Sequence, residues 1–284
     1  MKTFGLFLLP GAAVRQEEIG VVLKALDAPG TEILCRAADG IALPRVKSAG
    51  EAAFWKRSEC ILALGGDGTI LAAAPKAARS GTPVFGVNLG HVGFLTACGP
   101  HETEKLRRLL TNETYASRRM MLSLRINGRE RDVALNEILL APRDRGKLLA
   151  GSIWESGRYL TDFRADALLF HTSTGSTGYA FSAGGAVCGE EMRLIGVKAV
   201  SPYLRRGGHQ MLFREDALFT PKDLSCRGGP PEAVADGRRP VALKEGDRVE
   251  IARAEKDLVL LFAEPHDNQA IFCEKIREAG RERP

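Results

Sequence analysis

The chain has 284 residues, of which 44% are hydrophobic and 26% are charged, as is typical of a soluble globular protein. This length predicts one large domain or two ordinary domains of ~100–200 residues each. The net charge of +5 is mild, and lysine and arginine are interleaved with acids, so a nucleic-acid-binding protein is not indicated. No apolar stretch approaches the ~20 residues of a membrane span. We therefore expect neither nucleic acid nor a membrane among its partners.

The six cysteines are scattered along the chain and form no C-x-x-C pair, which argues against a zinc site or a disulfide framework. Dispersed thiols in a chain of this length favour a cytoplasmic protein. The histidines show no H-E-x-x-H or other metal spacing. We therefore predict no metal site built from protein ligands.

Residues 1–117 alternate short apolar runs with amphipathic segments. Strands are expected over residues 4–9, 32–35, 60–64 and 83–87. Helices are expected over residues 16–26 and 101–110, where apolar positions recur at helical spacing. The apolar start also imitates a short signal peptide, but the acids at Glu17 and Glu18 favour a buried strand. Strands separated by helices predict an α/β N-terminal domain with a parallel, doubly wound sheet.

From residue 118 onward the pattern changes to short strands separated by tight turns. Three hairpins are expected, around Asn127-Gly128, Ser156-Gly157 and Glu245-Gly246-Asp247. They join residues 120–126 to 132–140, residues 148–154 to 158–163, and residues 241–252 to 258–263. We predict a β-rich second domain over residues 118–263 and a helical tail over residues 264–284.

The first glycine cluster lies in residues 61–71, Ile-Leu-Ala-Leu-Gly-Gly-Asp-Gly-Thr-Ile-Leu, which predict a strand, a glycine turn and a helix start. Glycines allow close approach of the backbone to a ligand, and a helix N-terminus favours phosphate. Asp67 would repel phosphate, so it suits a different task, such as accepting a hydroxyl proton or holding a metal-bound phosphate through the ion. The alternative is that Asp67 only caps the helix. Pro75 is expected to kink or shorten that helix.

The sequence around Asp67 matches neither of two common phosphate-binding motifs. No G-x-x-x-x-G-K-[ST] is present, so this is not a Walker A loop. The third glycine of the dinucleotide fingerprint is also missing.

A second cluster follows the apolar residues 163–171. Residues 172–185, Thr-Ser-Thr-Gly-Ser-Thr-Gly-Tyr-Ala-Phe-Ser-Ala-Gly-Gly, are rich in hydroxyls and glycine. Such a loop offers donors for ribose hydroxyls and phosphate oxygens, and Tyr179 is placed to stack on a purine. The alternative is a Ser/Thr-rich surface loop. A hydrolase triad is not indicated, because the G-x-S-x-G elbow is absent.

Asn136 and Glu137 form a polar pair inside an expected apolar strand. Such a pair costs free energy unless it has partners. The ribose hydroxyls or base edge of a ligand are one source of partners, and neighbouring backbone groups are the alternative.

Together these residues resemble the NAD kinase family. The resemblance is carried by residues 65–69, 88–94, 135–137 and 172–185, with Asp236-Gly237 also fitting. It implies an α/β domain, a β-rich domain and an active site in the cleft between them. The implied reaction transfers the γ-phosphoryl group of ATP to the 2′-hydroxyl of the adenosine ribose of NAD, giving NADP. It also implies a divalent cation, Mg²⁺ or Mn²⁺, that acts with ATP, and a homodimer or homotetramer.

The resemblance implies roles for individual residues. Asp67 matches the aspartate that accepts the proton of the attacking hydroxyl, and Asp166 matches an acid near the nicotinamide end. The residues implied to bind the dinucleotide or ATP are Gly66, Gly68, Thr69, Asn136, Glu137, Lys147, Arg164, Asp166, Thr174, Thr177, Gly178, Tyr179, Ala180, Phe181, Ser182 and Arg238.

The chain departs from the family pattern at several positions around these residues. Ala165 and Ala167 stand where glycine is frequent, Ser173 where proline is usual, and Gly178 where alanine is usual. Arg238 stands where a neutral amide is common.

Two other functions are compatible with parts of this pattern. Lipid kinases of the diacylglycerol or sphingosine type share the first glycine motif, but the Asn136-Glu137 pair suits a nucleotide better. A non-catalytic dinucleotide sensor would retain the fold, although an intact Asp67 argues against it. The phosphoryl donor stays open between ATP, another nucleoside triphosphate and polyphosphate, as does the choice between NAD and NADH.

Overall fold

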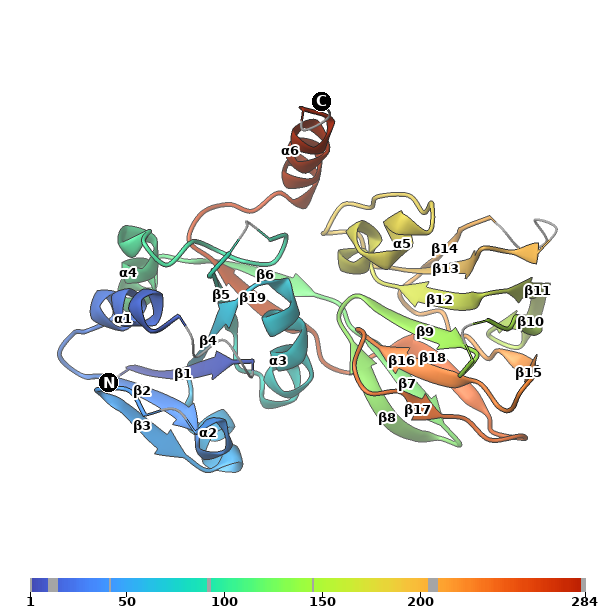
Figure 1. Ribbon diagram of the computed structural model, residues 1–284, viewed down its shortest axis with the longest axis horizontal. Coiled ribbons are helices and arrows are strands. Elements are labelled where there is room, and N and C mark those ends of the chain that lie inside the picture. The colour runs from blue at the N-terminus through green and yellow to red at the C-terminus, as the bar shows by residue number, and fades with distance from the viewer. Residues whose placement is uncertain are drawn as a thin grey trace. The chain divides into compact units, whose positions relative to one another are not determined.

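The structure is a computed structural model that describes residues 2–9, 15–40, 42–90, 93–144, 146–203 and 209–281. The chain forms two compact units, shown with their elements in Figure 1. The first unit comprises Met1–Arg118 and Leu258–Pro284, and the second comprises Arg119–Asp257. Each unit is described by itself below.

The first unit is built on a sheet of seven strands among its described residues, in the order β3-β2-β1-β4-β5-β19-β6. Five adjacent pairs, from β3 to β19, are parallel. The strands are β1 (Lys2–Leu8), β2 (Thr31–Arg36), β3 (Val46–Ala49), β4 (Cys60–Gly65), β5 (Val84–Asn88), β6 (Tyr115–Arg119) and β19 (Leu258–Phe262). The helices are α1 (Gln16–Ala25), α2 (Glu51–Arg57), α3 (Asp67–Ser80), α4 (Thr103–Thr111) and α6 (Asn268–Arg281).

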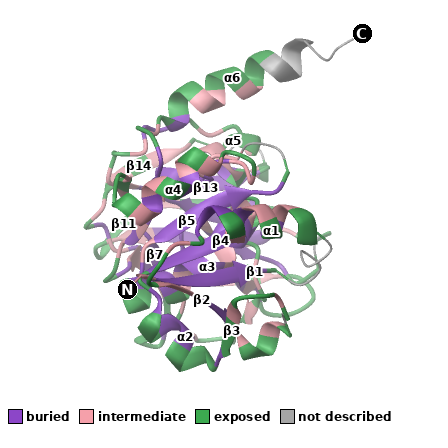
Figure 2. Cartoon of the chain, turned by 90° about the vertical axis from the view of Figure 1, so that its left-hand side faces the viewer, coloured by how far each residue is buried: buried purple, intermediate pink, exposed green. Residues whose placement is uncertain are grey.

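Helices cover both faces of this sheet. On one face Leu6, Leu62 and Phe85 share a core with α1 and α4. On the other face the rings of Phe7 and Trp55 lie 6.0 Å apart, which places α2 there. Figure 2 shows β1, β4 and β5 as buried strands among these helices. The predicted parallel, doubly wound α/β sheet is confirmed, and the structure adds β3 and α2, which the sequence did not predict.

Helix α3 continues through Pro75 for its full 14 residues. The expectation that Pro75 shortens the helix is therefore wrong. Ala77 and Ala78, which follow the proline, are buried, and the helix ends at Gly81 in the left-handed conformation. Packing of the second half of the helix against the sheet thus outweighs the local cost of the proline, because tertiary burial supplies most helical stability.

The second unit consists of strands from several small sheets around one apolar core. Its described strands pair in the orders β11-β10-β15, β14-β13-β12-β9-β16-β17 and β18-β7-β8. They are β7 (Leu122–Ile126), β8 (Arg129–Ala134), β9 (Glu137–Ala141), β10 (Leu149–Glu155), β11 (Arg158–Ala165), β12 (Ala167–His171), β13 (Leu194–Val200), β14 (Met211–Arg214), β15 (Lys222–Cys226), β16 (Glu232–Ala235), β17 (Val241–Ala242) and β18 (Val249–Arg253), with the short helix α5 (Tyr179–Ser182).

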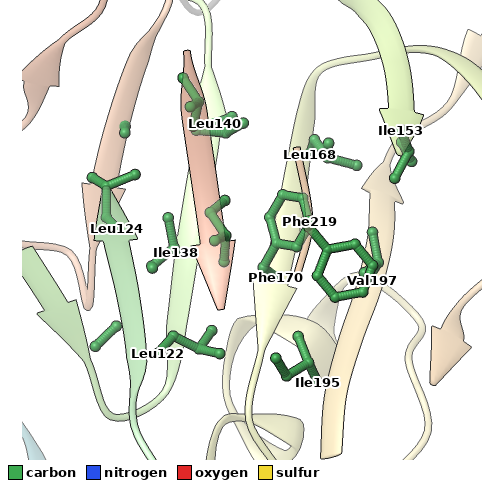
Figure 3. Close-up of a cluster of buried hydrophobic side chains, with 14 of the residues drawn as sticks. Leu122, Leu124, Ile138, Leu140, Ile153, Leu168, Phe170, Ile195, Val197 and Phe219 are labelled. Atoms are coloured by element: carbon green, nitrogen blue, oxygen red, sulfur yellow. The ribbon is translucent and has the colours of Figure 1, made fainter. Parts of the chain in front are cut away.

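The core of the second unit is made of alternating residues from these strands. Leu122 and Leu124 of β7, Ile138 of β9 and Phe170 of β12 are fully buried and belong to one cluster with Phe219 (Figure 3). Alternate residues of a strand point to the same face of its sheet, so residues two apart can share one interior. The prediction of a β-rich second region is confirmed.

Two of the three predicted hairpins are present and the third is not. Asn127-Gly128 joins β7 to β8, and Ser156-Gly157 joins β10 to β11. All four turn residues have positive φ, as the favoured two-residue turns demand. The predicted pairing of residues 241–252 with 258–263 is wrong.

Strand β18 pairs instead with β7, and β19 pairs in parallel with β5 of the first unit. The reason is the apolar character of β19 on both faces. Leu258, Leu260 and Phe262 are buried on one side, while Leu261 packs into the core shared with α1 and α4. A strand of this kind suits the interior of a parallel sheet covered by helices on both faces.

Candidate active site

Asp67 is the first residue of α3, directly after the turn that ends β4. The N-cap residue of α3 is Gly66, which has no side chain to cap the helix. The carboxylate of Asp67 binds another segment: Oδ2 accepts the backbone N–H of Phe94 at 2.8 Å and Oδ1 accepts that of Leu95 at 3.0 Å. The interpretation of Asp67 as a simple helix cap is therefore wrong. Each carboxylate oxygen retains lone-pair capacity beside its backbone hydrogen bond.

The glycines around Asp67 leave room for this arrangement. A Cβ on Gly93 would lie 2.0 Å from Asp67 Oδ1, so no larger residue fits there while the carboxylate keeps its place. Gly65 has φ of 154° and turns the chain from strand into helix. His91 and Val92 of the same motif lie outside the described residues. Gly93 and Gly65 together allow the half-buried carboxylate to face the segment 93–95.

A residue near the C-terminus, His266, also contacts the segment 93–95. His266 Nε2 lies 2.8 Å from the carbonyl oxygen of Phe94 and 2.7 Å from Oδ1 of Asn268. The imidazole stacks on Phe262 with ring centroids 3.8 Å apart. The sequence analysis gave His266 no role, and no local signal could have found it, because its partner lies 172 residues earlier in the chain.

In the second unit, Asn136 and Glu137 lie at a break between two strands. β8 ends at Ala134 and β9 begins at Glu137, so the expectation of one continuous strand over residues 132–140 is wrong. The cause is Asp236, whose carboxylate accepts the backbone N–H groups of Leu135 at 2.7 Å, of Asn136 at 2.8 Å and of Glu137 at 3.0 Å. These three N–H groups are thereby taken out of the strand ladder.

The side chains of this pair retain unused polar atoms. Asn136 Oδ1 and Glu137 Oε2 are buried and make no hydrogen bond among the described residues. Burial, and next the nearby charge of Asp236, raise the pKa of Glu137 from its ordinary value of 4.5 to about 7. Buried polar atoms are almost always hydrogen-bonded in folded proteins. These two atoms are therefore candidates for contact with a polar ligand. The alternative, that neighbouring backbone groups bind them, is not favoured, because Asp236 already accepts the backbone N–H groups of residues 135–137.

The hydroxyl-rich segment packs against this pair. Thr172 Oγ1 donates to the carbonyl oxygen of Leu135 at 2.6 Å and accepts the N–H of Gly175 at 3.1 Å. Residues 172–176 are buried, and Thr174–Thr177 form one 3₁₀ turn before α5. A Cβ on Gly178 would lie 3.6 Å from both Asn136 Nδ2 and Glu137 Oε2. The interpretation as a surface loop is therefore wrong for its first half.

Other predicted site residues are exposed in this unit. Tyr179 and Phe181 are 41% and 40% exposed, which leaves Tyr179 accessible to a base. Lys147, Arg164 and Asp166 are exposed as well. Their roles stay predictions.

Gly66, Gly68 and Thr69 lie in the first unit beside Asp67, and their proposed contacts to a ligand also stay predictions. Gly66 and Gly68 are exposed, whereas Thr69 is buried within the first turn of α3. The remaining predicted residues, Thr174, Thr177, Ala180 and Ser182, lie within or beside the 3₁₀ turn and α5.

Arg238 is engaged with protein groups. Its guanidinium donates to Asp132 at 2.8 Å, to Asp236 at 3.2 Å and to the carbonyl oxygen of Val133. Arg238 therefore supports the Asp236 carboxylate that breaks the strand, and its predicted contact to a dinucleotide is untested.

The packing of Gly175 against Asn136 gives a stability prediction. Gly175→Ala would place a Cβ 2.2 Å from the backbone oxygen of Asn136. We therefore expect this substitution to lower the free energy of unfolding, measured in urea, by about 1–3 kcal/mol, the usual cost of overpacking. Gly178→Ala is the matched control, because its Cβ would meet no atom nearer than 3.4 Å. Equal stability of the two variants would contradict the packing described here.

Three further observations concern the described residues. They contain no group of three or more His, Cys, Asp or Glu side chains placed to hold a metal ion. They contain no helix that is long and apolar enough to cross a membrane. A cavity of about 1050 Å³ in the second unit, lined in part by Trp154, Lys222 and Pro230, includes none of the predicted site residues.

Sequence comparisons point to one family. Residues 15–115 match the ATP-NAD kinase N-terminal domain and residues 135–262 match the ATP-NAD kinase C-terminal domain. The chain is 36% identical to the NAD kinase of Corynebacterium glutamicum over 236 residues, which cover 78% of this chain and 79% of the relative. It is 33% identical to NAD kinase 2 of Streptomyces coelicolor over 255 residues, covering 85% and 82% of the two chains.

Two solved structures share the fold. The yeast NADH kinase complexed with NADH matches with a TM-score of 0.83 and 18% identity, over 98% of this chain and 88% of the other. An NAD kinase from Archaeoglobus fulgidus in complex with ATP matches with a TM-score of 0.75 and 24% identity, over 98% and 99% of the two chains. At these identities the similarity concerns the fold, an α/β unit with a parallel sheet and a β-rich unit.

Proposed function

The chain belongs to the ATP-NAD kinase family, and from this premise we propose that Asp67 is the proton acceptor of the reaction. As a member of the family the protein is an NAD kinase, a phosphotransferase that moves the γ-phosphoryl group of ATP to the 2′-hydroxyl of the adenosine ribose of NAD and so forms NADP. A lipid kinase or a non-catalytic sensor is not favoured by these relatives.

One observation carries the proposal for Asp67. Its carboxylate is aimed by two backbone N–H groups, those of Phe94 and Leu95, and does not fold back onto its own helix. Phosphoryl transfer needs little covalent chemistry from a protein beyond alignment and charge neutralisation. A carboxylate held in this way takes the proton of the attacking 2′-hydroxyl as the O–P bond forms in line. The bond from the γ-phosphorus to the bridging oxygen then breaks, and ADP leaves with that electron pair.

We assign the dinucleotide to the polar residues of the second unit. Asn136 Oδ1 and Glu137 Oε2 are the acceptors that ribose hydroxyls would satisfy. Tyr179 is exposed enough to stack on the adenine, a contact for which aromatic rings are suited. The hydroxyls of Thr174, Thr177 and Ser182 would contribute further polar contacts. Support comes from the packing of this segment against Asn136 and Glu137.

The phosphates and their cation are assigned to the glycine turn before α3. Mg²⁺ is usually bound by one or two carboxylates together with substrate phosphates, and Asp67 is a carboxylate with free lone pairs at a helix N-terminus. The donor set therefore fits a cation that arrives with ATP and is held by the phosphates, with Asp67 beside it left to accept the proton. When bound, the ion would neutralise charge on the triphosphate. Gly66 and Gly68 would let backbone N–H groups approach the phosphates.

Two finer assignments belong to the proposal as well. We expect a homodimer or homotetramer in solution and a cytoplasmic location. The names of the relatives do not include these properties, and each needs its own measurement.

The test of the proposed function is a panel of acceptors and donors with the purified protein and Mg²⁺. NAD and NADH are each combined with ATP, another nucleoside triphosphate or polyphosphate, and 2′-phosphorylated product is quantified by chromatography. Diacylglycerol and sphingosine serve as alternative acceptors. We expect NADP from NAD and ATP and no phosphorylated lipid, and the reverse result would overturn the assignment.

A further inference from the structure

His171 is a fully buried histidine at the end of β12, directly before the hydroxyl-rich segment. Its Nδ1 lies 2.8 Å from the carbonyl oxygen of Thr172, and its Nε2 lies 2.6 Å from Nε2 of Gln210. The ring has room because its register partner on β13 is Gly196, whose Cβ would lie 2.0 Å from His171 Nε2. Both ring nitrogens therefore have defined partners.

The partners of Gln210 determine where the imidazole proton is. Gln210 Oε1 accepts the backbone N–H of Ala186 at 2.6 Å, so its amide nitrogen faces His171. An amide NH₂ group only donates, so His171 Nε2 must accept and carry no proton. The single proton then resides on Nδ1 and donates to the carbonyl of Thr172. This network requires a neutral imidazole, and burial lowers the pKa of His171 in the same direction.

Gln210 joins the two ends of one segment. Through His171 and Ala186 it fastens residues 171–186, which contain the 3₁₀ turn and α5 and are coloured yellow-green to yellow in Figure 1. The N–H of Gly185 also donates to the carbonyl of Ala180 at 2.8 Å, which closes the end of α5. A Cβ on Gly185 would lie 3.2 Å from Gln210 Nε2, so the glycine admits the glutamine.

We propose that His171 and Gln210 are a positioning pair that holds residues 172–185 in their binding conformation and thereby sets the affinity for NAD. The proposal rests on the proposed function, because it is there that this segment is assigned to the adenosine end of NAD. Neither side chain is a catalytic residue, since both act on the dinucleotide through the segment they fasten.

Protonation of His171 would break the pair, because an N–H would then face the NH₂ group of Gln210. The charged residues on the strands beside His171 are Glu137, its register partner on β9, and Lys198 on β13, whose charge also disfavours the imidazolium. We therefore expect the KM for NAD to rise as the pH falls through the titration of His171, while kcat at saturating NAD does not follow the same curve.

The experiment compares two variants at Gln210 over a pH series. Gln210→Ala removes both hydrogen bonds and is expected to raise the KM for NAD about two- to tenfold where His171 is neutral, the range for loss of a modest hydrogen bond. Its KM should lack the acid rise, and kcat should change little. Gln210→Glu presents two acceptors, to Ala186 and to a protonated His171. We expect it to weaken or reverse the acid rise in KM. Gln16→Glu, which is exposed on α1, is the matched control.

Tyr179→Ala separates this proposal from the function it rests on. If Tyr179→Ala raises the KM for NAD but Gln210→Ala leaves the KM and its pH profile unchanged, the positioning pair is refuted while the assignment of the segment stands. If Tyr179→Ala and Gln210→Ala both leave the KM unchanged, both assignments fail. Circular dichroism and thermal unfolding of each variant verify that it is folded before kinetics are interpreted.

Discussion

Replacing Asp67 by asparagine is expected to lower kcat for NADP formation by about 10²–10⁴-fold, the usual contribution of a positioned general base. The KM for NAD is expected to change much less, because the residues assigned to the dinucleotide lie in the other unit. Asparagine has one acceptor oxygen where aspartate has two. One of the N–H groups of Phe94 and Leu95 therefore faces an NH₂ group in the variant, and hydrogen exchange at that amide should become faster.

Three further variants serve as a second test and as controls. Gly93→Ala keeps the carboxylate but displaces it, since the added Cβ would lie 2.0 Å from Asp67 Oδ1, and a misplacement of about 1 Å can cost ~10²-fold in rate. Gly90→Ala in the same loop is its control, with no atom nearer than 3.8 Å. Glu104→Gln removes an acid from the first turn of α4 without touching this loop. Turnover of Asp67→Asn within about threefold of the unsubstituted enzyme, far below the general-base range, would remove Asp67 from the role.

Replacing Glu137 by glutamine is expected to stabilise the free protein at neutral pH and to weaken NAD binding. Burial and the charge of Asp236 raise the pKa of Glu137 from 4.5 to about 7. Between pH 4.5 and about pH 7, Glu137 holds a proton in the folded protein that it has released in the unfolded chain. The contribution of Glu137 to the free energy of unfolding is therefore complete below pH 4.5, declines as the pH rises and is lost above pH 7.

Glutamine carries no charge at any pH, so the variant should lack this decline. We expect it to match the unsubstituted protein near pH 4 and to exceed its unfolding free energy by up to about 3 kcal/mol at pH 8. The KM for NAD should rise about 10–100-fold, as for loss of a hydrogen bond to a charged group. Urea unfolding over a pH series and steady-state kinetics measure both effects.

Glu245→Gln is the control for the Glu137 variant, because that glutamate is exposed in the same unit. It should leave the pH dependence of stability unaltered. An identical pH profile for Glu137→Gln and the unsubstituted protein would show that Glu137 is not the group that titrates. If Glu137→Gln raises the free energy of unfolding and also weakens NAD binding, then Glu137 serves the ligand and lowers the stability of the fold, as residues of functional sites often do.

Much of the candidate site is predictable where its signal is local. The strand, glycine turn and helix around Asp67 lie within residues 60–80, and an apolar run followed by glycines specifies them. The hairpins at Asn127-Gly128 and Ser156-Gly157 follow from positive φ at two adjacent residues, which few residue types adopt. The prediction that residues 172–185 bind a nucleotide also depends only on composition.

Predictions failed where the deciding partner is distant in sequence. The break between β8 and β9 depends on Asp236, about a hundred residues after Asn136. The sequence pattern predicts that residues 258–263 pair with residues 241–252. β19 joins the first sheet instead, since only the assembled sheet offers a cover of helices on both of its faces. Pro75 stays inside α3 for a similar reason, because burial of the residues after it is decided by the sheet.

The amino-acid sequence by itself determined the types of the main elements and the order of the two regions. It also singled out Asp67 as an acid in a glycine turn, and Asn136 and Glu137 as a polar pair between apolar residues. Tertiary structure alone decided what holds these residues in place. Two backbone amides bind the Asp67 carboxylate, and Asp236 binds the backbone N–H groups of residues 135–137. The physical reason is the separation along the sequence over which each interaction acts. Backbone preference and periodicity act over a few residues, whereas hydrogen bonds and burial join groups that only folding brings together.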